Sequence, residues 1–217
     1  MATKQHLMHH WRSANLNEHL LNAFNTIPRE NFVPPSLRER AYEDKPLPTL
    51  RGQSISQPTT VMVMLDALEV KEGDKIFEVG SGAGYQAALL SQLVGTSGTV
   101  ISTEVVPELV TLAKKNMNDL NLTNVDILEI DGSEGDPVNG PFDKIIITAA
   151  CPTIPQPLID QLKENGIIVA PVGDLKSQTM IKGTKSGERL ELDFIGPFQF
   201  VPMKGKHGFK ETELFND

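Results

Sequence analysis

The stretch from Ile76 to Tyr85 places the strongest restriction on what this chain can fold into. It reads Ile-Phe-Glu-Val-Gly-Ser-Gly-Ala-Gly-Tyr, so an apolar run ends in three glycines at alternate positions. Glycine adopts positive φ angles without steric cost and permits a tight turn, and the pattern after Gly84 predicts a helix whose first N–H groups are free. A strand, a turn and a helix in this order typically bind a nucleotide-like ligand at the helix N-terminus.

The chain on either side repeats the alternation of strand and helix. Strands are predicted at 75–79, 99–103, 125–130, 142–148 and 166–172, and helices at 85–94, 107–120 and 155–163. Repeated units of this kind predict a mostly parallel sheet with helices on both faces. Segments 178–182 and 189–195, joined by 184–187, predict an antiparallel hairpin. We therefore expect a doubly wound, Rossmann-like α/β fold with an antiparallel hairpin at the sheet edge.

Length and composition fit one domain. The chain has 217 residues, of which 39% are hydrophobic and 22% are charged, which is enough for one α/β core. We expect residues 1–70 to form N-terminal helices and a covering arm, residues 71–175 to form the ligand-binding α/β core, and residues 176–217 to form the edge hairpin and a tail.

Charge and hydropathy argue against several classes of partner. The net charge is −8 and no basic block occurs, so nucleic acid is not an expected partner. Apolar stretches such as 61–68 are too short to span a bilayer, and the polar start lacks a signal-peptide core. A single cysteine, Cys151, cannot form an internal disulfide, which fits a reducing compartment. We expect a cytoplasmic monomer with no membrane partner.

Three histidines near the N-terminus allow two interpretations. His6, His9 and His10 have the spacing of one helical face, which permits metal binding. No nearby cysteine or carboxylate pattern completes a coordination shell, so a solvated N-terminal helix is the favoured interpretation and no metal is expected.

Residues 28–58 form a proline-rich segment, called the arm below. It is rich in apolar residues, which argues against disorder and favours a lid over the ligand site. The arm ends in Gly-Gln-Ser-Ile-Ser-Gln-Pro, residues 52–58, just before a predicted helix. Ser56 or Gln57 is therefore expected at the helix cap, where a hydroxyl and free N–H groups can receive a carboxylate. Ser56 serving only as a cap is the alternative.

Spacing and acidic residues separate two kinds of nucleotide ligand. The turn has the spacing Gly80-x-Gly82-x-Gly84 rather than that of the dinucleotide fingerprint, and Glu78 stands two residues before the first glycine. A carboxylate there repels a pyrophosphate and suits the ammonium and sulfonium charges of S-adenosylmethionine.

Two further acidic residues are expected at the same edge of the sheet. Glu104 ends the second strand, where its carboxylate can accept hydrogen bonds from ribose hydroxyls, as NAD sites also do. Asp131, followed by Gly132, comes after the third strand and suits an adenine amino group. Each carboxylate alone is also compatible with a solvated loop. Their position after successive parallel strands favours a shared site.

With these residues, the chain resembles the class I S-adenosylmethionine-dependent methyltransferases. It is similar in particular to the protein-L-isoaspartate O-methyltransferases over residues 27–203. The matching motifs are Ala-Tyr-Glu-Asp-Lys-Pro-Leu-Pro at 41–48, Gly-Gln-Ser-Ile-Ser-Gln-Pro at 52–58, Thr-Ala-Ala at 148–150 and Pro-Val-Gly at 171–173.

The resemblance implies methyl transfer from S-adenosylmethionine to the free α-carboxylate of L-isoaspartyl residues in damaged proteins and peptides. S-adenosylhomocysteine is the other product, and collapse of the ester to a succinimide allows repair. The resemblance also implies that Ser56 contacts the acceptor and is the catalytic residue, and that Ile55 and Val201 bind the substrate. The donor is expected to contact Ser54, Glu78, Gly80, Ser81, Gly82, Gly84, Tyr85, Gln86, Glu104, Asp131 and Gly132.

The sequence departs from the family pattern at a few positions. Cys151 stands where the family often has alanine, and we expect an inert residue rather than a nucleophile. Lys204 stands where threonine or serine is common, which leaves local substrate contacts open and suggests attraction of an acidic peptide. Residues 205–209 match nothing in the pattern.

Three other functions remain open. They are a methyltransferase of the same superfamily with another acceptor, a catalytically silent domain that binds S-adenosylmethionine or a protein, and an NAD-dependent oxidoreductase. The glycine spacing and Glu78 disfavour the last of these.

Overall fold

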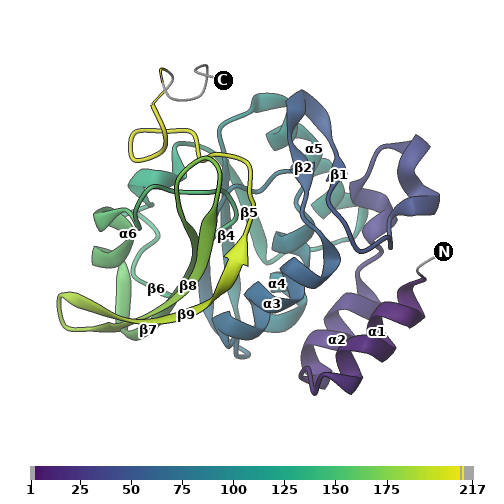
Figure 1. Cartoon of the computed structure of the whole chain (residues 1–217), viewed down its shortest axis with the longest axis horizontal. Coiled ribbons are helices and arrows are strands. Elements are labelled where there is room, and N and C mark those ends of the chain that lie inside the picture. The colour runs from purple at the N-terminus through teal and green to yellow at the C-terminus, as the bar shows by residue number, and fades with distance from the viewer. Residues whose placement is uncertain (1–2, 211, 213–217) are drawn as a thin grey trace.

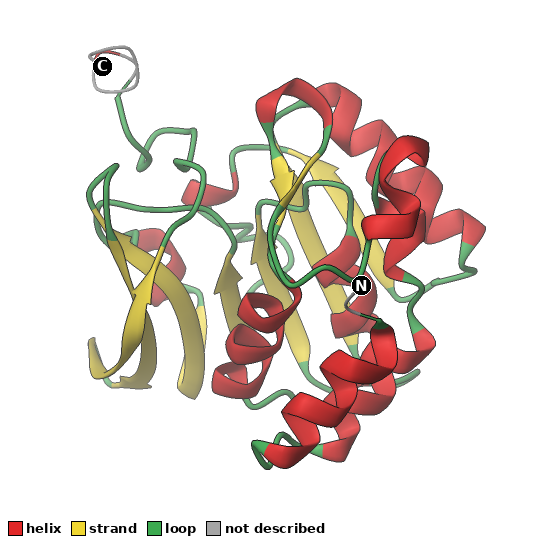
Figure 2. Cartoon of the chain, turned by 45° about the vertical axis from the view of Figure 1, so that its right-hand side comes forward, coloured by secondary structure: helices red, strands yellow, loops and turns green. Residues whose placement is uncertain are grey.

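The computed structural model describes residues 3–210 and 212, and its centre is a twisted seven-stranded sheet (Figures 1 and 2). The strand order is β5-β4-β3-β6-β7-β8-β9; the first five are parallel, and β8 and β9 are antiparallel to their neighbours. The strands are β3 (Lys75–Val79), β4 (Thr99–Glu104), β5 (Val125–Glu129), β6 (Phe142–Ile147), β7 (Leu162–Gly173), β8 (Gln178–Ser186) and β9 (Arg189–Phe198). The predicted fold class is confirmed.

Helices lie before and between the strands. The α-helices are α1 (Lys4–Ser13), α2 (Glu18–Thr26), α3 (Pro58–Leu68), α4 (Tyr85–Val94), α5 (Pro107–Asp119) and α6 (Gln156–Asp160). Short 3-10 helices are η1 (Arg29–Phe32), η2 (Pro35–Arg40), η3 (Leu50–Gly52) and η4 (Gly132–Glu134), and β1 (Leu47–Pro48) pairs with β2 (Ser54–Ile55). The predicted domain spans residues 1–217, of which residues 1–2, 211 and 213–217 lie outside the described residues.

The sheet buries apolar side chains on both faces. In β3, Ile76 packs with the cluster that includes residues of α3, α4 and α5, whereas Phe77 packs with the cluster that includes Leu158 of α6. Successive strand residues point to opposite faces, so the continuous apolar runs of the parallel strands are buried on both sides. This packing holds the carboxyl ends of β3, β4 and β6 rigidly side by side.

Helix α2 packs against α4 and α3, and α1 packs against α2, at the end of the molecule opposite β7, β8 and β9 (Figure 1). Trp11 meets Phe24 edge to face, with ring centroids 4.7 Å apart. Its indole Nε1 donates to Thr59 Oγ1 at 3.0 Å, so the polar end of this buried ring is satisfied. The histidines of α1 are exposed, and no cluster of three metal-ligating side chains occurs among the residues that the structure describes.

Several element boundaries differ from the sequence predictions. The helix predicted at 155–163 ends at Asp160, because Leu162 already pairs with Phe142 in the sheet. Residues 184–186 belong to β8 rather than to a turn, and the chain reverses at Gly187, whose φ is 62°. Within the arm, residues 35–40 form the 3-10 helix η2.

Candidate active site

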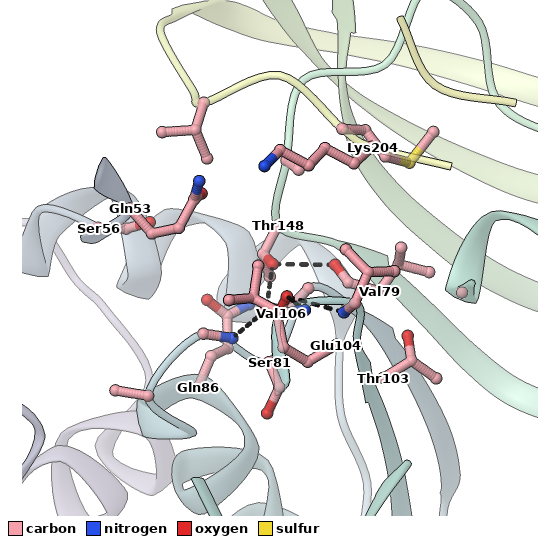
Figure 3. Close-up of a pocket in the computed structure, with 18 of the residues that line it drawn as sticks. Gln53, Ser56, Val79, Ser81, Gln86, Thr103, Glu104, Val106, Thr148 and Lys204 are labelled. Carbon is pink, nitrogen blue, oxygen red and sulfur yellow. Dashed lines mark hydrogen bonds between the residues drawn. The ribbon is translucent and has the colours of Figure 1, made fainter. Parts of the chain in front are cut away.

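A cavity lies at the carboxyl ends of the parallel strands, beneath the arm (Figure 3). It sits where the chain order reverses between β4 and β6, which is the usual ligand site of open α/β sheets. The predicted site residues that line it are Ser54, Ile55, Ser56, Gly80, Ser81, Gly82, Tyr85, Gln86, Glu104, Gly132 and Val201. Glu78, Gly84 and Asp131 are not among the lining residues.

The glycine turn forms the floor of the cavity. Gly80, Gly82 and Gly84 have φ angles of 97°, 54° and 89°, a region that side chains rarely adopt. A Cβ on Gly80 would lie 2.5 Å from Thr148 Oγ1, whereas one on Gly82 would meet no atom within 4 Å. The backbone at Gly82 is therefore open to a closely approaching ligand.

Hydrogen bonds from neighbouring strands fix this turn. The N–H groups of Gly80 and Ser81 donate to the carbonyl of Thr103 at 2.9 and 2.8 Å. Thr148 Oγ1, which follows β6, donates to the carbonyl of Gly80 at 2.5 Å. The turn is thus held in place from both sides of β3.

Glu104 presents a fixed carboxylate to the cavity. Its Oε2 accepts from the N–H of Gly82 at 2.9 Å, and its Oε1 accepts from those of Val105 and Val106 at 2.8 and 3.0 Å. Oε1 is occupied by two donors, whereas Oε2 has a second acceptor direction, so Glu104 can still accept from a hydroxyl group of a ligand. Its predicted contact with ribose fits this arrangement.

Glu78 lies behind the cavity, wholly buried in β3. Its Oε2 accepts from Ser102 Oγ at 2.5 Å, and its Oε1 has no partner among the described residues. Burial, reinforced by the charge of Glu104, raises the pKa of Glu78 to about 8 although the bond from Ser102 opposes the change. Glu78 is therefore largely protonated at pH 7, so it carries too little negative charge to exclude a pyrophosphate by itself. Its contact with the donor stays a prediction.

Asp131 is engaged by the segment that the sequence left unassigned. Its Oδ1 accepts from the N–H of Ser133 at 3.0 Å, and its Oδ2 accepts from the N–H of Lys206 at 2.7 Å. The N–H of His207 also donates to Ser133 Oγ at 3.1 Å. The segment 205–207 thus packs over the end of β5, and the contact between Asp131 and adenine stays a prediction.

Polar groups without partners mark the cavity as a site for a polar ligand. Ser81 and Gln86 line it, and Ser81 Oγ and Gln86 Nε2 are buried without a hydrogen-bond partner in residues 3–210 and 212. Buried polar atoms are normally satisfied, so both atoms fit contacts with a bound molecule. A polar nucleoside lying on the open turn is compatible with them.

The end of the arm forms the opposite wall. Ser56 lines the cavity and does not cap α3, because Gln57 is the N-cap residue (Figure 3). Asp44 instead binds the start of α3, accepting from the N–H of Thr59 at 2.9 Å. The Ser56 hydroxyl has no hydrogen-bond partner in the described part of the chain and remains available to a ligand.

Several lining residues were not assigned to the site from the sequence. They are Gln53, Val61, Val79, Ala83, Thr103, Val105, Val106, Ile130, Thr148, Ala149 and Met203. Those at or just after strand ends, such as Thr103 and Thr148, follow from the rule that ligands bind at the carboxyl edge. Met203 depends on a backbone contact with Ala150, which no local pattern reveals.

Cys151 lies beside the site, and its thiol is unreactive. It is fully buried, its Sγ donates to the carbonyl of Pro171 at 3.6 Å, and burial raises the pKa of the thiol to about 12. A thiol with this pKa is a poor nucleophile at neutral pH, in line with the expected inert role.

The reversal of strand order and the open glycine turn place the molecule among the class I S-adenosylmethionine-dependent methyltransferases. Within this class, a model of the protein-L-isoaspartate(D-aspartate) O-methyltransferase family matches residues 2–208, and the chain belongs to this family. Protein-L-isoaspartate O-methyltransferase 2 of Archaeoglobus fulgidus is 43% identical over 198 residues, covering 91% of this chain and 90% of the relative. The enzyme of Methanocella arvoryzae is 45% identical over 184 residues, covering 85% and 97%.

Solved structures agree with this assignment. A protein-L-isoaspartate O-methyltransferase superposes with a TM-score of 0.87 at 28% identity, covering 95% of this chain and 67% of that one. A Plasmodium falciparum structure in complex with S-adenosyl-L-homocysteine shares the fold, with a TM-score of 0.80 at 23% identity and coverage of 94% and 99%. No helix among the described residues has the length and apolar character needed to cross a membrane.

Proposed function

We propose that this enzyme transfers a methyl group from S-adenosylmethionine to the free α-carboxylate of L-isoaspartyl residues in damaged proteins and peptides. One observation carries the proposal. A single cavity joins the glycine turn and Glu104 on one wall to Ser56 on the other. A donor on the glycine turn and an acceptor on Ser56 would face each other across this cavity.

The reaction requires alignment more than acid–base chemistry. The bound donor supplies a sulfonium methyl group, so attack by the acceptor oxygen forms a C–O bond while the C–S electrons remain on sulfur. A carboxylate with a pKa near 4 is already ionised at pH 7 and needs no general base. In keeping with this, no histidine of the described chain lines the cavity. The arm excludes water from the nucleophile and limits its orientations.

The placement of the residues supports a specific role for each in this proposal. Ser56 donates its hydroxyl hydrogen to one acceptor oxygen, and Ile55 and Val201 provide apolar contacts for the substrate. Glu104 receives the ribose hydroxyls of the donor. The remaining donor contacts are those proposed for Ser54, Glu78, Gly80, Ser81, Gly82, Gly84, Tyr85, Gln86, Asp131 and Gly132.

A methyl-transfer assay with two matched peptides tests this function. The wild-type enzyme should methylate an isoaspartyl peptide and leave its aspartyl counterpart nearly untouched. Replacing Ser56 by alanine should lower the rate on the isoaspartyl peptide by about 10²-fold, because one aligning hydrogen bond is lost, while affinity for S-adenosylhomocysteine is retained. Equal methylation of both peptides would indicate another acceptor. Donor binding without turnover would indicate a silent domain.

The proposed working state is a cytoplasmic monomer that acts on isoaspartyl proteins. The lone buried Cys151 is compatible with a reducing compartment. Sedimentation of the purified protein tests the monomer, with a stable dimer as the contrary result.

A further inference from the structure

Arg29, in η1 of the arm, is a fully buried cation that the site description leaves unexplained. Its side chain has no exposed surface, which is rare for arginine unless a carboxylate pairs with it. The guanidinium instead donates to two backbone carbonyls, from Nε to Ala41 at 2.8 Å and from Nη2 to Ser56 at 2.7 Å. Its Nη1 has no partner in residues 3–210 and 212.

The acidic side chains near Arg29 make their hydrogen bonds to other groups, although the charge of Asp44 still acts on the guanidinium. Glu30 accepts from the hydroxyl of Tyr42 at 2.5 Å, and Asp44 accepts from Thr59. Among the described residues, Arg29 takes part in no ion pair. A buried charge without a directly paired counter-ion is costly, and part of that cost is recovered when an anion binds nearby.

Arg29 lies directly behind both walls of the cavity. It holds the backbone of Ser56, which lines the acceptor side. The centre of its guanidinium also lies 4.9 Å from the ring of Tyr85, which lines the donor side and begins α4 just after the glycine turn. One buried cation therefore contacts the residues that are proposed to hold the two substrates.

We propose that Arg29 is a positioning residue for the acceptor: it fixes the Ser56 backbone against Tyr85, and its positive charge makes the cavity selective for an anionic acceptor group. The inference rests on the proposed role of Ser56. Charges interact strongly where water is excluded, so a guanidinium one residue layer behind the wall favours a carboxylate over a neutral group of the same shape.

The test uses an isoaspartyl peptide and its α-carboxamide analogue, which is neutral and nearly the same shape. The wild type should bind the carboxylate peptide at least about tenfold more tightly than the amide. Arg29→Gln, which keeps a hydrogen-bond donor but loses the charge, should bring this ratio close to one. Arg29→Lys should keep most of the ratio and raise KM for the peptide several-fold, because lysine cannot bind both carbonyls in one plane.

Donor affinity provides the reference in each variant. Affinity for S-adenosylhomocysteine should change far less than KM for the peptide. Phe142→Leu is the matched control, since this buried ring lies at the start of β6, away from the cavity. Its loss should lower the Tm, whereas the carboxylate-to-amide ratio and the affinity for S-adenosylhomocysteine should stay at wild-type values.

The contrary outcomes are distinct. An unchanged carboxylate-to-amide ratio in Arg29→Gln would overturn the electrostatic role. If Arg29→Gln does not fold, the Arg29→Lys variant provides the test. A KM for the peptide equal to that of the wild type would then overturn the positioning role. A wild type that methylates no isoaspartyl peptide would overturn the proposed function itself.

Discussion

Glu78 combines complete burial with one unpartnered oxygen, and this makes the stability of the protein depend on pH. The pKa of Glu78 is about 8 in the folded protein and about 4.5 in the unfolded chain. The folded protein therefore keeps a proton that the unfolded chain releases, so the contribution of the neutral carboxyl to stability is complete below pH 4.5 and is lost as the pH rises towards 8.

Replacing Glu78 by glutamine should remove this dependence. The amide stays neutral at every pH, so the free energy of unfolding of the variant, relative to wild type, should rise between pH 5 and 8 by at most about 1.4 kcal/mol per pH unit. Urea denaturation at several pH values measures the difference. Parallel stability curves for the two proteins would show that Glu78 titrates normally.

Lys204 lines the cavity and extends toward Gln53 (Figure 3), on the proposed path of the acceptor chain. It is exposed and has no ion-pair partner within the described chain. We expect isoaspartyl peptides with acidic neighbours to have a lower KM than those with basic neighbours, and Lys204→Glu to reverse this order by about three- to tenfold, an effect that weakens with added salt.

Lys114→Glu on α5 makes the same change in net charge at an exposed position that does not line the cavity. It should leave the preference unchanged. If Lys204→Glu keeps the wild-type preference for acidic over basic neighbours, Lys204 does not contact the substrate.

The sequence predicted the positions of site residues well where the backbone alone determines them, and their roles stay predictions. Gly80, Gly82 and Glu104 are fixed by strand geometry and line the cavity as expected, whereas Gly84 has the expected positive φ but does not line it. The surroundings of Asp131 were not predictable, because its carboxylate is held by the N–H of Lys206, far along the chain. The protonation of Glu78 depends on burial, which a single sequence does not reveal.

Among the elements, α3 illustrates how the arm is anchored. The N–H and Oγ1 of Thr59, in its first turn, donate to the carboxylate of Asp44 at 2.9 and 2.7 Å, and Trp11 donates to the same hydroxyl. Asp44 thus caps the helix from a distant part of the arm, and the bond connects α1, the arm and α3.

Asp44→Ala should lower the free energy of unfolding by about 1 kcal/mol, as the loss of a helix cap does, and should also raise KM for the peptide because Ser56 lies next to α3. Chemical denaturation and kinetics measure the two effects. Asp66→Ala, on an exposed side chain of the same helix, is the control. Equal losses in both variants would exclude a specific capping role.

Element boundaries were predictable only where periodicity was uninterrupted. Strand β3 and helix α4 have the predicted limits, because apolar runs and neighbouring glycines mark their ends. Strand β7 begins earlier than predicted, since Asn165 adopts a φ of 61° inside it and the sheet register shifts there. Pairing across the sheet, rather than local preference, set that boundary.

At the scale of the whole molecule, the two walls of the cavity come from different parts of the chain and meet only in the folded state. A ligand that bridges them therefore stabilises the fold by mass action. S-adenosylhomocysteine at about 100 times its Kd should add ~2.7 kcal/mol and raise the Tm by about 5–10 °C.

Thermal unfolding with and without the ligand measures this shift, and NAD at the same concentration serves as the control. We expect no comparable shift with NAD. A larger shift with NAD than with S-adenosylhomocysteine would contradict the assignment of the donor.

The contacts of segment 201–207 determine when this enzyme can first function during its synthesis. Ala150 donates its N–H to the carbonyl of Val201, Met203 donates to that of Ala150, and Lys206 holds Asp131. A nascent polypeptide that has left the ribosome only as far as β9 already contains the glycine turn and Ser56. It lacks segment 201–207, which supplies cavity-lining residues such as Val201 and Met203. Prematurely terminated products should therefore be inactive although their core is present.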